Sequence, residues 1–347
     1  MKTCRQAMPG VLLVAAISAL AYALTGLDAA VRYGVGSLTL AIVIGALLGN
    51  AVPQLGGGAF RHGLSLAQRY FLRAGVALFG FNLSLQQIIE IGAAGVLVDV
   101  VMVVSTLAMG WFLGRRVLNM HRDTVLLVAA GSAICGAAAV VATVPVLGLK
   151  RGEDAEKTAL AVASVVLFGT LAMFVYPLIY AWLGAAHFDF GIYVGSTVHE
   201  VAQVVAIGTA LGEEVGYNAV IAKMIRVMLL VPFLLIVATL VARRIRREAA
   251  QTGVAEPVVL RQPITLPWFA LCFIAIAGLN SLAVLPEPLV AALRLTGILL
   301  LTTAMAALGI DTNIRRMGQA GLRPLLLGAG LFAHLILTGG LVNWLMH

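Results

Sequence analysis

Long runs of hydrophobic residues dominate the chain, and polar positions are confined to short stretches between them. A helical run of about 18 or more apolar residues is long enough to cross roughly 30 Å of hydrocarbon. The pattern predicts spans near residues 9–27, 33–52, 69–89, 93–114, 156–183, 217–243, 265–283, 289–309 and 322–346. We therefore expect an all-α polytopic membrane protein with about 9–11 transmembrane helices.

Two further apolar segments, near 124–148 and 190–212, depart from this pattern. Each carries a break rich in small residues, "GSAICGAAAV" in the first segment and "GSTVHEVAQVV" in the second. Glycine weakens a helix and permits turns, so both segments are predicted to be broken or re-entrant helices. Non-helical backbone at membrane depth survives only where it is buried in protein or lines a watery cavity.

The two broken segments resemble each other. Aligning Gly131 with Gly195, an offset of 64 residues, places "GSAICGAAAVVATVPVLG" over "GSTVHEVAQVVAIGTALG". A weaker similarity, at an offset of 229, relates 78–95 to 307–324. Internal repeats of this kind are typical of transporters, with the binding site at the repeat interface. We expect one transporter domain, 1–347, with repeat-like halves at about 69–183 and 190–346.

The direction of the spans favours re-entrant hairpins. If both broken segments are hairpins, the two copies in each internal similarity are antiparallel, and both similarities are inverted repeats. If both segments cross the membrane, the two Gly-Ser segments are parallel whereas the spans 69–89 and 289–309 are antiparallel, so the two repeats disagree. With hairpins, clusters such as Arg115–Arg116 and "RRIRR" at 243–247 fall on one side, as the positive-inside rule requires. Discontinuous crossing helices remain the alternative. The polar stretch 244–263 is interpreted as a cytoplasmic loop.

Composition and charge narrow the class further. The 347 residues are 61% hydrophobic and 11% charged, against about a quarter charged in soluble domains. The net charge of +8 lies in loops between spans and acts as a topology signal, so no nucleic-acid partner is expected. The basic, apolar N-terminus resembles a signal peptide, but we expect it to remain as the first span.

A polar cluster follows Gly195 in the second segment. Helical spacing places Ser196, His199 and Gln203 on one face, with Glu200 adjacent. Such residues at bilayer depth usually mark a pathway, although they can also serve only to bond neighbouring helices. The pattern H-E-x-x-Q lacks the second histidine of a zinc site, so no metal and no cofactor are predicted.

Two cations share one face of the 217–243 span. Lys223 and Arg226 lie deep enough to need a partner or a function. They are candidates for attracting an anionic substrate or for pairing with Glu200. The alternative is that Lys223 snorkels to the outer interface and that Arg226 binds Glu213, Glu214 or a carbonyl. The first repeat carries no such charges, and this asymmetry favours the substrate interpretation.

Helix N-termini at the two breaks suit a small anion, with serine hydroxyls as added donors. His199 or Glu200 would carry a coupling proton. Asn82 and Asp311 end matching spans as pathway residues or as helix caps, and Asp99 is a further acidic candidate within a span. Cys135 is a candidate ligand or a small packing residue. The predicted substrate-binding set is Gly131, Ser132, Cys135, Gly136, Gly195, Ser196, Gln203, Lys223 and Arg226, and the predicted coupling set is His199, Glu200, Asn82 and Asp311.

Four stretches carry a family resemblance: "GSTVHEVAQVVAIG", "GSAICGAAAVVA", "KMIRVMLLVP" and "RAGVALFGFNLSLQQI". They resemble the YeiH-type family of bacterial inner-membrane proteins, to which sulfate export is attributed, and the resemblance covers nearly the whole chain. The family is grouped with the cation–proton antiporter and anion transporter fold, which implies inverted repeats and broken helices. It also implies a multi-pass protein of the bacterial inner membrane, here oriented with a cytoplasmic N-terminus and a periplasmic C-terminus.

The expected function is therefore secondary transport, as an exporter, of a small anion such as sulfate, sulfite or a sulfonate, by alternating access and with H⁺ or Na⁺ as the coupling ion. A sodium- or proton-coupled carrier of an organic acid is the alternative within the same class. The chain is not expected to be an enzyme, and an intramembrane hydrolase using His199 and Glu200 is the alternative of another class. The lipid bilayer is the expected surrounding. The N-terminal spans are candidates for a homodimer interface, although no residue pattern in them selects that role.

Overall fold

The computed structural model describes residues 2–26, 36–149, 155–183, 188–252, 267–312 and 322–346, and every regular element in these ranges is helical. Six helical segments are long and apolar enough to cross a membrane: Gln6–Leu24, Leu85–Val117, Lys157–Leu183, Glu213–Arg244, Glu287–Asp311 and Leu322–Leu345. A seventh arises if Ser37–Ala51 and Pro53–Asn82, which meet at a bend of 111°, count as one span. The chain is thus an all-α polytopic membrane protein.

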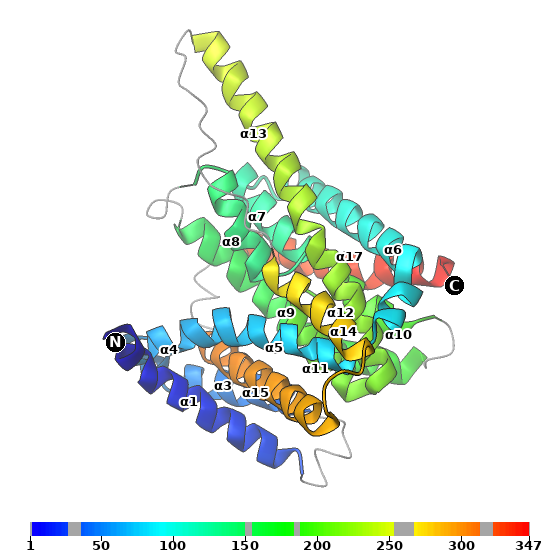
Figure 1. The fold of residues 1–347 in the computed structure, drawn as a ribbon. Coiled ribbons are helices and arrows are strands. Elements are labelled where there is room, and N and C mark those ends of the chain that lie inside the picture. The colour runs from blue at the N-terminus through cyan, green and yellow to red at the C-terminus, as the bar shows by residue number, and fades with distance from the viewer. Residues whose placement is uncertain are drawn as a thin grey trace.

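The helices pack as two groups (Figure 1). The first group surrounds the long helix α15, at the bottom of the view. Its members are α1 (Lys2–Leu24), α3 (Ser37–Ala51), α4 (Arg61–Leu66), η3 (Ala67–Phe71), α5 (Leu72–Phe79) and α15 (Glu287–Asp311). Helix α14 (Trp268–Ser281) packs mainly on α5 and also touches the second group.

The second group contains both broken segments. Its members are α6 (Leu85–Trp111), η5 (Phe112–Val117), α7 (Arg122–Ala133), α8 (Ala137–Val146), α9 (Ala155–Leu183), α10 (Phe190–Thr197), α11 (Val201–Leu211), α12 (Glu213–Met228), α13 (Leu230–Thr252) and α17 (Leu322–Leu345). Helices α7, α10, α11 and α12 are among the most completely buried elements of the described chain. The polar segments predicted from the sequence are therefore at the centre of this group.

Small residues bring α3 and α15 close together. A Cβ added to Gly309 would lie 2.9 Å from the backbone nitrogen of Ala46 and 3.0 Å from the Cα of Gly45. Side chains larger than hydrogen would separate these backbones, and such small-residue contacts are a common way to pack helices in lipid. The first group is thereby built as a tight helical layer.

Two predicted boundaries differ from the structure. The spans expected at 69–89 and 93–114 meet at 80–84, because Ser84 begins α6 with a capping box: its hydroxyl accepts from the Gln87 N–H at 3.3 Å, and Gln87 Oε1 accepts from the Ser84 N–H at 2.8 Å. Gly92 kinks α6, with φ 34°, and does not end it. The predicted loop 244–263 is helical up to Thr252, since α13 continues that far; the remainder lies outside the described residues.

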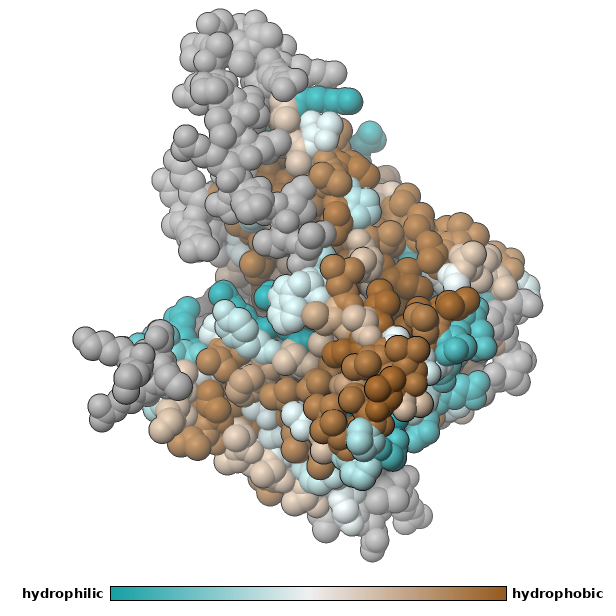
Figure 2. Space-filling view, viewed as in Figure 1, coloured by the Kyte–Doolittle hydropathy of each residue, from teal (hydrophilic) through white to brown (hydrophobic). Residues whose placement is uncertain are grey.

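The surface of the described chain suits a lipid surrounding. Many large apolar side chains are exposed, including Leu178 at 69%, Leu337 at 72% and Ile236 at 60%. Hydrophobic residues cover much of the face shown in Figure 2. A water-soluble monomer rarely exposes such extended apolar area, so these faces are expected to contact hydrocarbon.

Candidate functional site at the tips of two helical hairpins

The first broken segment, α7–α8, is a hairpin. Helix α7 ends at Ala133, and the chain turns through 134–136, where Gly136 adopts φ 69°. Val125, near the start of α7, packs in the same cluster as Leu147, which follows α8. A straight broken helix would hold these two positions far apart, because each residue advances the axis by about 1.5 Å. The segment therefore enters the protein and returns on the same side.

The second broken segment, α10–α11, is also a hairpin. Asn218 of α12 donates to Asp189 at the start of α10 at 2.7 Å. At the end of α11, a Cβ added to Gly208 would lie 3.3 Å from the backbone nitrogen of Gly216, also near the start of α12. The beginning of α10 and the end of α11 thus lie at the same end of α12. Of the two alternatives left open by the sequence, the hairpin is the one that the structure contains.

The hairpins approach each other from opposite ends of α9. The first packs on the N-terminal part of α9, where Val165 contacts it, and the second packs on the C-terminal part, where the Tyr180 and Phe190 rings lie 4.9 Å apart. The second tip contacts the C-terminal half of α9, where Tyr176 donates to Thr197 Oγ1 at 2.7 Å. The two tips meet where the Ala137 N–H of the first donates to Glu200 Oε1 of the second at 3.1 Å. This is the inverted arrangement that the parity of the internal repeat predicts.

Arg226 of α12 joins equivalent positions of the two tips. Its Nη2 donates to the Ser132 carbonyl at 2.9 Å, and its Nη1 donates to the Ser196 carbonyl, which is the aligned position of the repeat. Its Nε donates to the Ala133 carbonyl at 2.5 Å. The guanidinium is fully buried, so these bonds supply its polar surroundings.

Lys223 repeats the same relationship one turn earlier in α12. Its Nζ donates to the carbonyls of Ile134 and Val198, each at 2.7 Å, and these two residues are again equivalent in the repeat. The carbonyls at a helix C-terminus lack intrahelical partners and carry partial negative charge. Lys223 and Arg226 therefore neutralise the C-terminal ends of both α7 and α10.

These contacts change the interpretation of the two cations. Lys223 is 0% exposed and does not snorkel to an interface. Among the described residues, no ion pair joins either cation to Glu200, and Arg226 binds carbonyls, as one of the sequence-based alternatives held. The charges belong to one repeat in sequence but contact both repeats equally in space. Their asymmetry along the chain therefore no longer favours the substrate interpretation over a scaffold role, and the substrate role stays a prediction.

Glu200 performs the complementary role at a helix N-terminus. It is the N-cap residue of α11, but its Oε1 accepts from the backbone N–H of Ala137, the first residue of α8, at 3.1 Å. Gln203 Oε1 accepts from the Glu200 N–H at 3.1 Å and holds this turn. A carboxylate at a helix N-terminus is electrostatically favourable. Glu200 therefore connects the two hairpin tips through a contact that crosses the repeat.

Several buried polar atoms around the tips have no hydrogen-bond partner among the residues that the structure describes. A native interior rarely leaves such groups unsatisfied, and each one needs a functional or solvent-based explanation. Their concentration at one place identifies the hairpin tips as the candidate site. The atoms are Ser132 Oγ, Thr170 Oγ1, both ring nitrogens of His199, Glu200 Oε2 and Gln203 Nε2, with both carboxylate oxygens of Asp99 on α6.

Asp99 belongs to the site, although the sequence gives little indication of it. It is completely buried and lies within electrostatic range of Arg226 and Lys223. In the sequence Asp99 is an acidic candidate within a span, and nothing in the sequence places it beside the two cations. Its signal is that it is the only charged residue between Glu90 and Arg115.

The remaining predicted residues divide into three sets. Gly195 packs on α12, where an added Cβ would lie 3.0 Å from the backbone nitrogen of Lys223. Ser196 Oγ donates to the Tyr193 carbonyl at 3.2 Å. Gly131 lies in the last turn of α7, and Cys135 and Gly136 lie in the turn of the first hairpin. Asn82 and Asp311 have partners on other elements: Asn82 donates to the Phe79 carbonyl at 3.1 Å, and Asp311 accepts from Gln68 at 2.6 Å.

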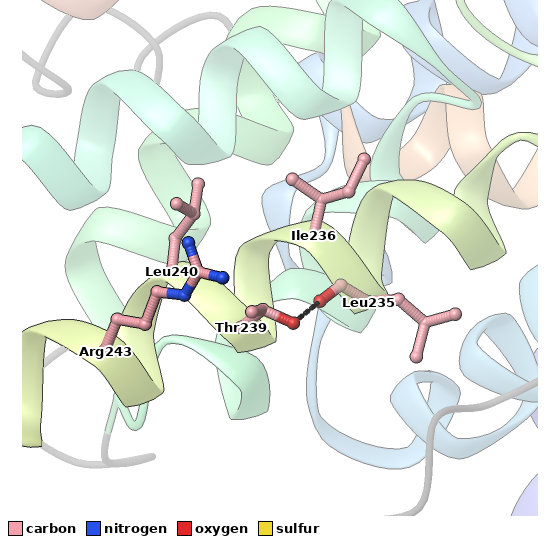
Figure 3. Close-up of a pocket in the computed structure, with 5 residues that line it drawn as sticks. All are labelled: Leu235, Ile236, Thr239, Leu240 and Arg243. Atoms are coloured by element: carbon pink, nitrogen blue, oxygen red, sulfur yellow. Dashed lines mark hydrogen bonds between the residues drawn. The ribbon is translucent and has the colours of Figure 1, made fainter.

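A shallow pocket on α13 lies apart from this site (Figure 3). Leu235, Ile236, Thr239, Leu240 and Arg243 line it, and all five come from one helix. Thr239 Oγ1 bonds the Leu235 carbonyl of its own helix at 2.8 Å, so it offers no free donor there. An open apolar surface of this kind on a membrane-spanning helix is suited to lipid contact.

Comparison with known proteins places the chain in a family. A family model described as conserved hypothetical protein 698 matches residues 9–328. The chain belongs to this family. A UPF0324 membrane protein of Yersinia pestis is 44% identical over 343 residues, covering 97% of this chain and 92% of the relative. The UPF0324 inner membrane protein YeiH of Salmonella typhi is 44% identical over 345 residues, covering 98% and 94%.

YeiH of Escherichia coli K12 is 42% identical over 343 residues, which cover 98% of this chain and 94% of the relative. These relatives confirm the resemblance drawn from the Gly-Ser and H-E-V-A-Q stretches. Their names, together with the apolar helices, support an inner-membrane protein. The names assign no substrate.

Proposed function

We propose that the chain is a secondary transporter of a small anion such as sulfate, sulfite or a sulfonate, and that the hairpin tips form its substrate site. The observation that supports this proposal is the group of unpartnered, buried polar atoms where two inverted hairpins meet. Transporter sites typically lie near the bilayer midplane, at the interface of inverted repeats and between broken helices.

The donors at the tips favour an anion. Ser132 Oγ, Gln203 Nε2 and a ring nitrogen of His199 are donors without a partner in the described part of the chain. Arg226 uses three of its five N–H donors to bind carbonyls, and Lys223 uses two of its three. A sulfate-like oxyanion accepts hydrogen bonds only, so it fits a site with a surplus of donors.

The carboxylates favour coupling to a cation. Glu200 Oε2 and both oxygens of Asp99 are the unpartnered acceptors of the same region. A proton, or a sodium ion, would satisfy them and would keep the total charge low when an anion enters. The same acceptors support proton- or sodium-coupled transport of an organic acid, because a carboxylate substrate would use the same donors.

Transport would expose the site at the hairpin tips first to one side of the membrane and then to the other. The two groups of helices share fewer contacts with each other than within themselves, which suits rocking of one group against the other. His199 is not hydrogen-bonded to Ser196, so these two residues form no nucleophile–base pair of the kind that the hydrolase alternative requires.

The test is uptake of labelled sulfate into proteoliposomes, with and without a pH gradient. Sulfite, taurine, thiosulfate and citrate serve as competitors that separate inorganic anions from organic acids. We expect gradient-dependent uptake that falls strongly in His199→Ala and Gln203→Ala, with the exposed Arg243→Ala as a matched control. Absence of uptake and of competition by every anion would contradict the proposal.

A further inference from the structure

Glu200 bonds a helix to which it does not belong. Its backbone begins α11 of the second hairpin, whereas its Oε1 binds the first N–H of α8 in the first hairpin, at 3.1 Å from the Ala137 nitrogen. Its other oxygen, Oε2, has no partner in the described ranges of the chain, and the residue is 6% exposed. One carboxylate oxygen is thus held at a helix N-terminus while the other remains available.

The place that this carboxylate fills depends on a glycine. Gly136 has φ 69°, and a Cβ at this position would lie 2.7 Å from Glu200 Oε1. In the aligned repeat, the position equivalent to Gly136 is Glu200 itself. Only one of the two positions carries a side chain, and that side chain occupies the space in front of α8.

A further donor group lies beside Glu200. Gln203 bonds the Glu200 backbone through Oε1, so its amide lies beside Glu200, and its Nε2 has no partner although the residue is 1% exposed. Ser132 Oγ is likewise unpartnered at the first tip. An anion at the α8 N-terminus would lie close to the Gln203 amide, and the Glu200 carboxylate already occupies that position.

We propose that the Glu200 carboxylate occupies the anion site in competition with the substrate, and that a substrate anion displaces it as Glu200 binds one proton. This inference rests on the proposed function and specifies how its proton coupling works. The proton comes from the aqueous phase open to the site and binds a Glu200 carboxylate oxygen. No bond of the substrate changes, and the anion replaces one carboxylate charge at the α8 N-terminus.

Charged and titratable groups around Glu200 fit this exchange. Lys223 on α12 and the Cys135 thiol of the facing tip lie within its electrostatic range. Arg226 and Asp99 complete the buried charges of the region. His199, the other proposed proton carrier, lies within range of both cations, so protonating it would add a third positive charge there. Glu200 is therefore the better exchanger.

The test uses the full chain, purified in detergent, with labelled sodium sulfate as the probe. Sulfate affinity is measured from about pH 6 to pH 8.5, and protons taken up per bound sulfate are measured in weak buffer. Glu200→Gln keeps the size of the side chain but cannot ionise. Glu214→Gln, at an exposed position of the first turn of α12, is the matched control.

We expect the wild type and Glu214→Gln to take up close to one proton per sulfate. Their affinity should fall by up to about tenfold per pH unit as Glu200 becomes ionised. Glu200→Gln should bind sulfate with no proton uptake and with nearly constant affinity. In proteoliposomes it should still exchange sulfate for sulfate but should no longer accumulate it in response to a pH gradient.

Two results with Glu200→Gln would overturn this inference and leave the proposed function standing. The first is unchanged proton uptake, which would assign the proton to another group. The second is loss of sulfate binding in a variant whose thermal unfolding matches the wild type, because a competitor's removal cannot abolish binding. If wild-type protein binds none of sulfate, sulfite and taurine, the proposed function fails, and the inference fails with it.

Discussion

The carbonyl oxygens of Ser132 and Ser196 bind the same guanidinium, that of Arg226. The two serines are equivalent in a repeat with an offset of 64 residues, and they end helices that enter the protein from opposite ends of α9. One side chain thus fixes the meeting point of two inverted hairpins. The scaffold and the candidate substrate site are in this way parts of one structure.

Arg226→Ala should both destabilise the protein and stop transport. It leaves three buried carbonyls without a donor, at a cost of about 1–3 kcal/mol for each group. Arg226→Lys keeps the charge but cannot reach three carbonyls at once, so its loss should be intermediate. Thermal unfolding in detergent and sulfate uptake are the measurements, with Arg243→Ala as control. Unchanged anion transport in Arg226→Ala would refute the assignment.

Gly136→Ala should impair transport more than its size suggests. The new methyl group would meet Glu200 Oε1 at 2.7 Å, and the backbone would keep a φ of 69° that favours glycine. We expect a loss of stability of about 1–3 kcal/mol and transport reduced at least about tenfold. Gly278→Ala in α14 meets nothing within 4 Å and is the matched control. Equal behaviour of the two variants would show that Glu200 has no fixed place at α8.

Asp99→Asn should increase sulfate affinity and slow turnover. It removes one negative charge close to two buried cations, so an anion gains about threefold or more in affinity and leaves more slowly. Binding of labelled sulfate and the rate of sulfate exchange are the measurements. Glu90→Gln, an exposed position on the same helix, should change neither. A loss of sulfate affinity in Asp99→Asn would indicate that Asp99 holds a bound cation on which the anion depends.

The hairpin topology predicts opposite exposure of two engineered cysteines. Leu149→Cys follows the end of α8, and Glu213→Cys follows the end of α11, in a chain without its natural cysteines. Because the hairpins enter from opposite sides, a membrane-impermeant thiol reagent should label Glu213→Cys from the periplasm and Leu149→Cys from the cytoplasm. Labelling of both from one side would contradict the inverted arrangement.

Much of the fold was predictable from local pattern. The Gly-Ser breaks, the inverted parity and the depth of Lys223 and Arg226 all follow from apolar run lengths and from glycine placement. The start of α6 was misplaced because the kink at Gly92 resembles a boundary, whereas the capping box at Ser84 determines the real one. The capping box, and not the single glycine, marks the start of this helix.

The contacts of the site were not predictable in the same way. Lys223 and Arg226 bind backbone carbonyls, and a sequence does not show which carbonyls a fold will present to a cation. Glu200 reaches the N-terminus of a helix more than 60 residues away, and Asp99 meets the cations only because α6 packs on α12. These relationships depend on tertiary packing. Asn82 donates to the Phe79 carbonyl at the end of α5, as its helix-cap alternative allows, whereas Asp311 accepts from Gln68 of another element.

The most direct test uses the native Cys135 thiol at the first hairpin tip as a reporter. Cys4 and Cys272 are replaced by Ser, Cys135 is kept, and the same chain with Cys135→Ala is the background. We expect a small thiol reagent to label Cys135 from either side of the membrane as the carrier alternates, and saturating sulfate to slow this labelling several-fold. A thiol that no reagent reaches from one of the two sides, or whose labelling no tested anion alters, would contradict a transport site at the hairpin tips.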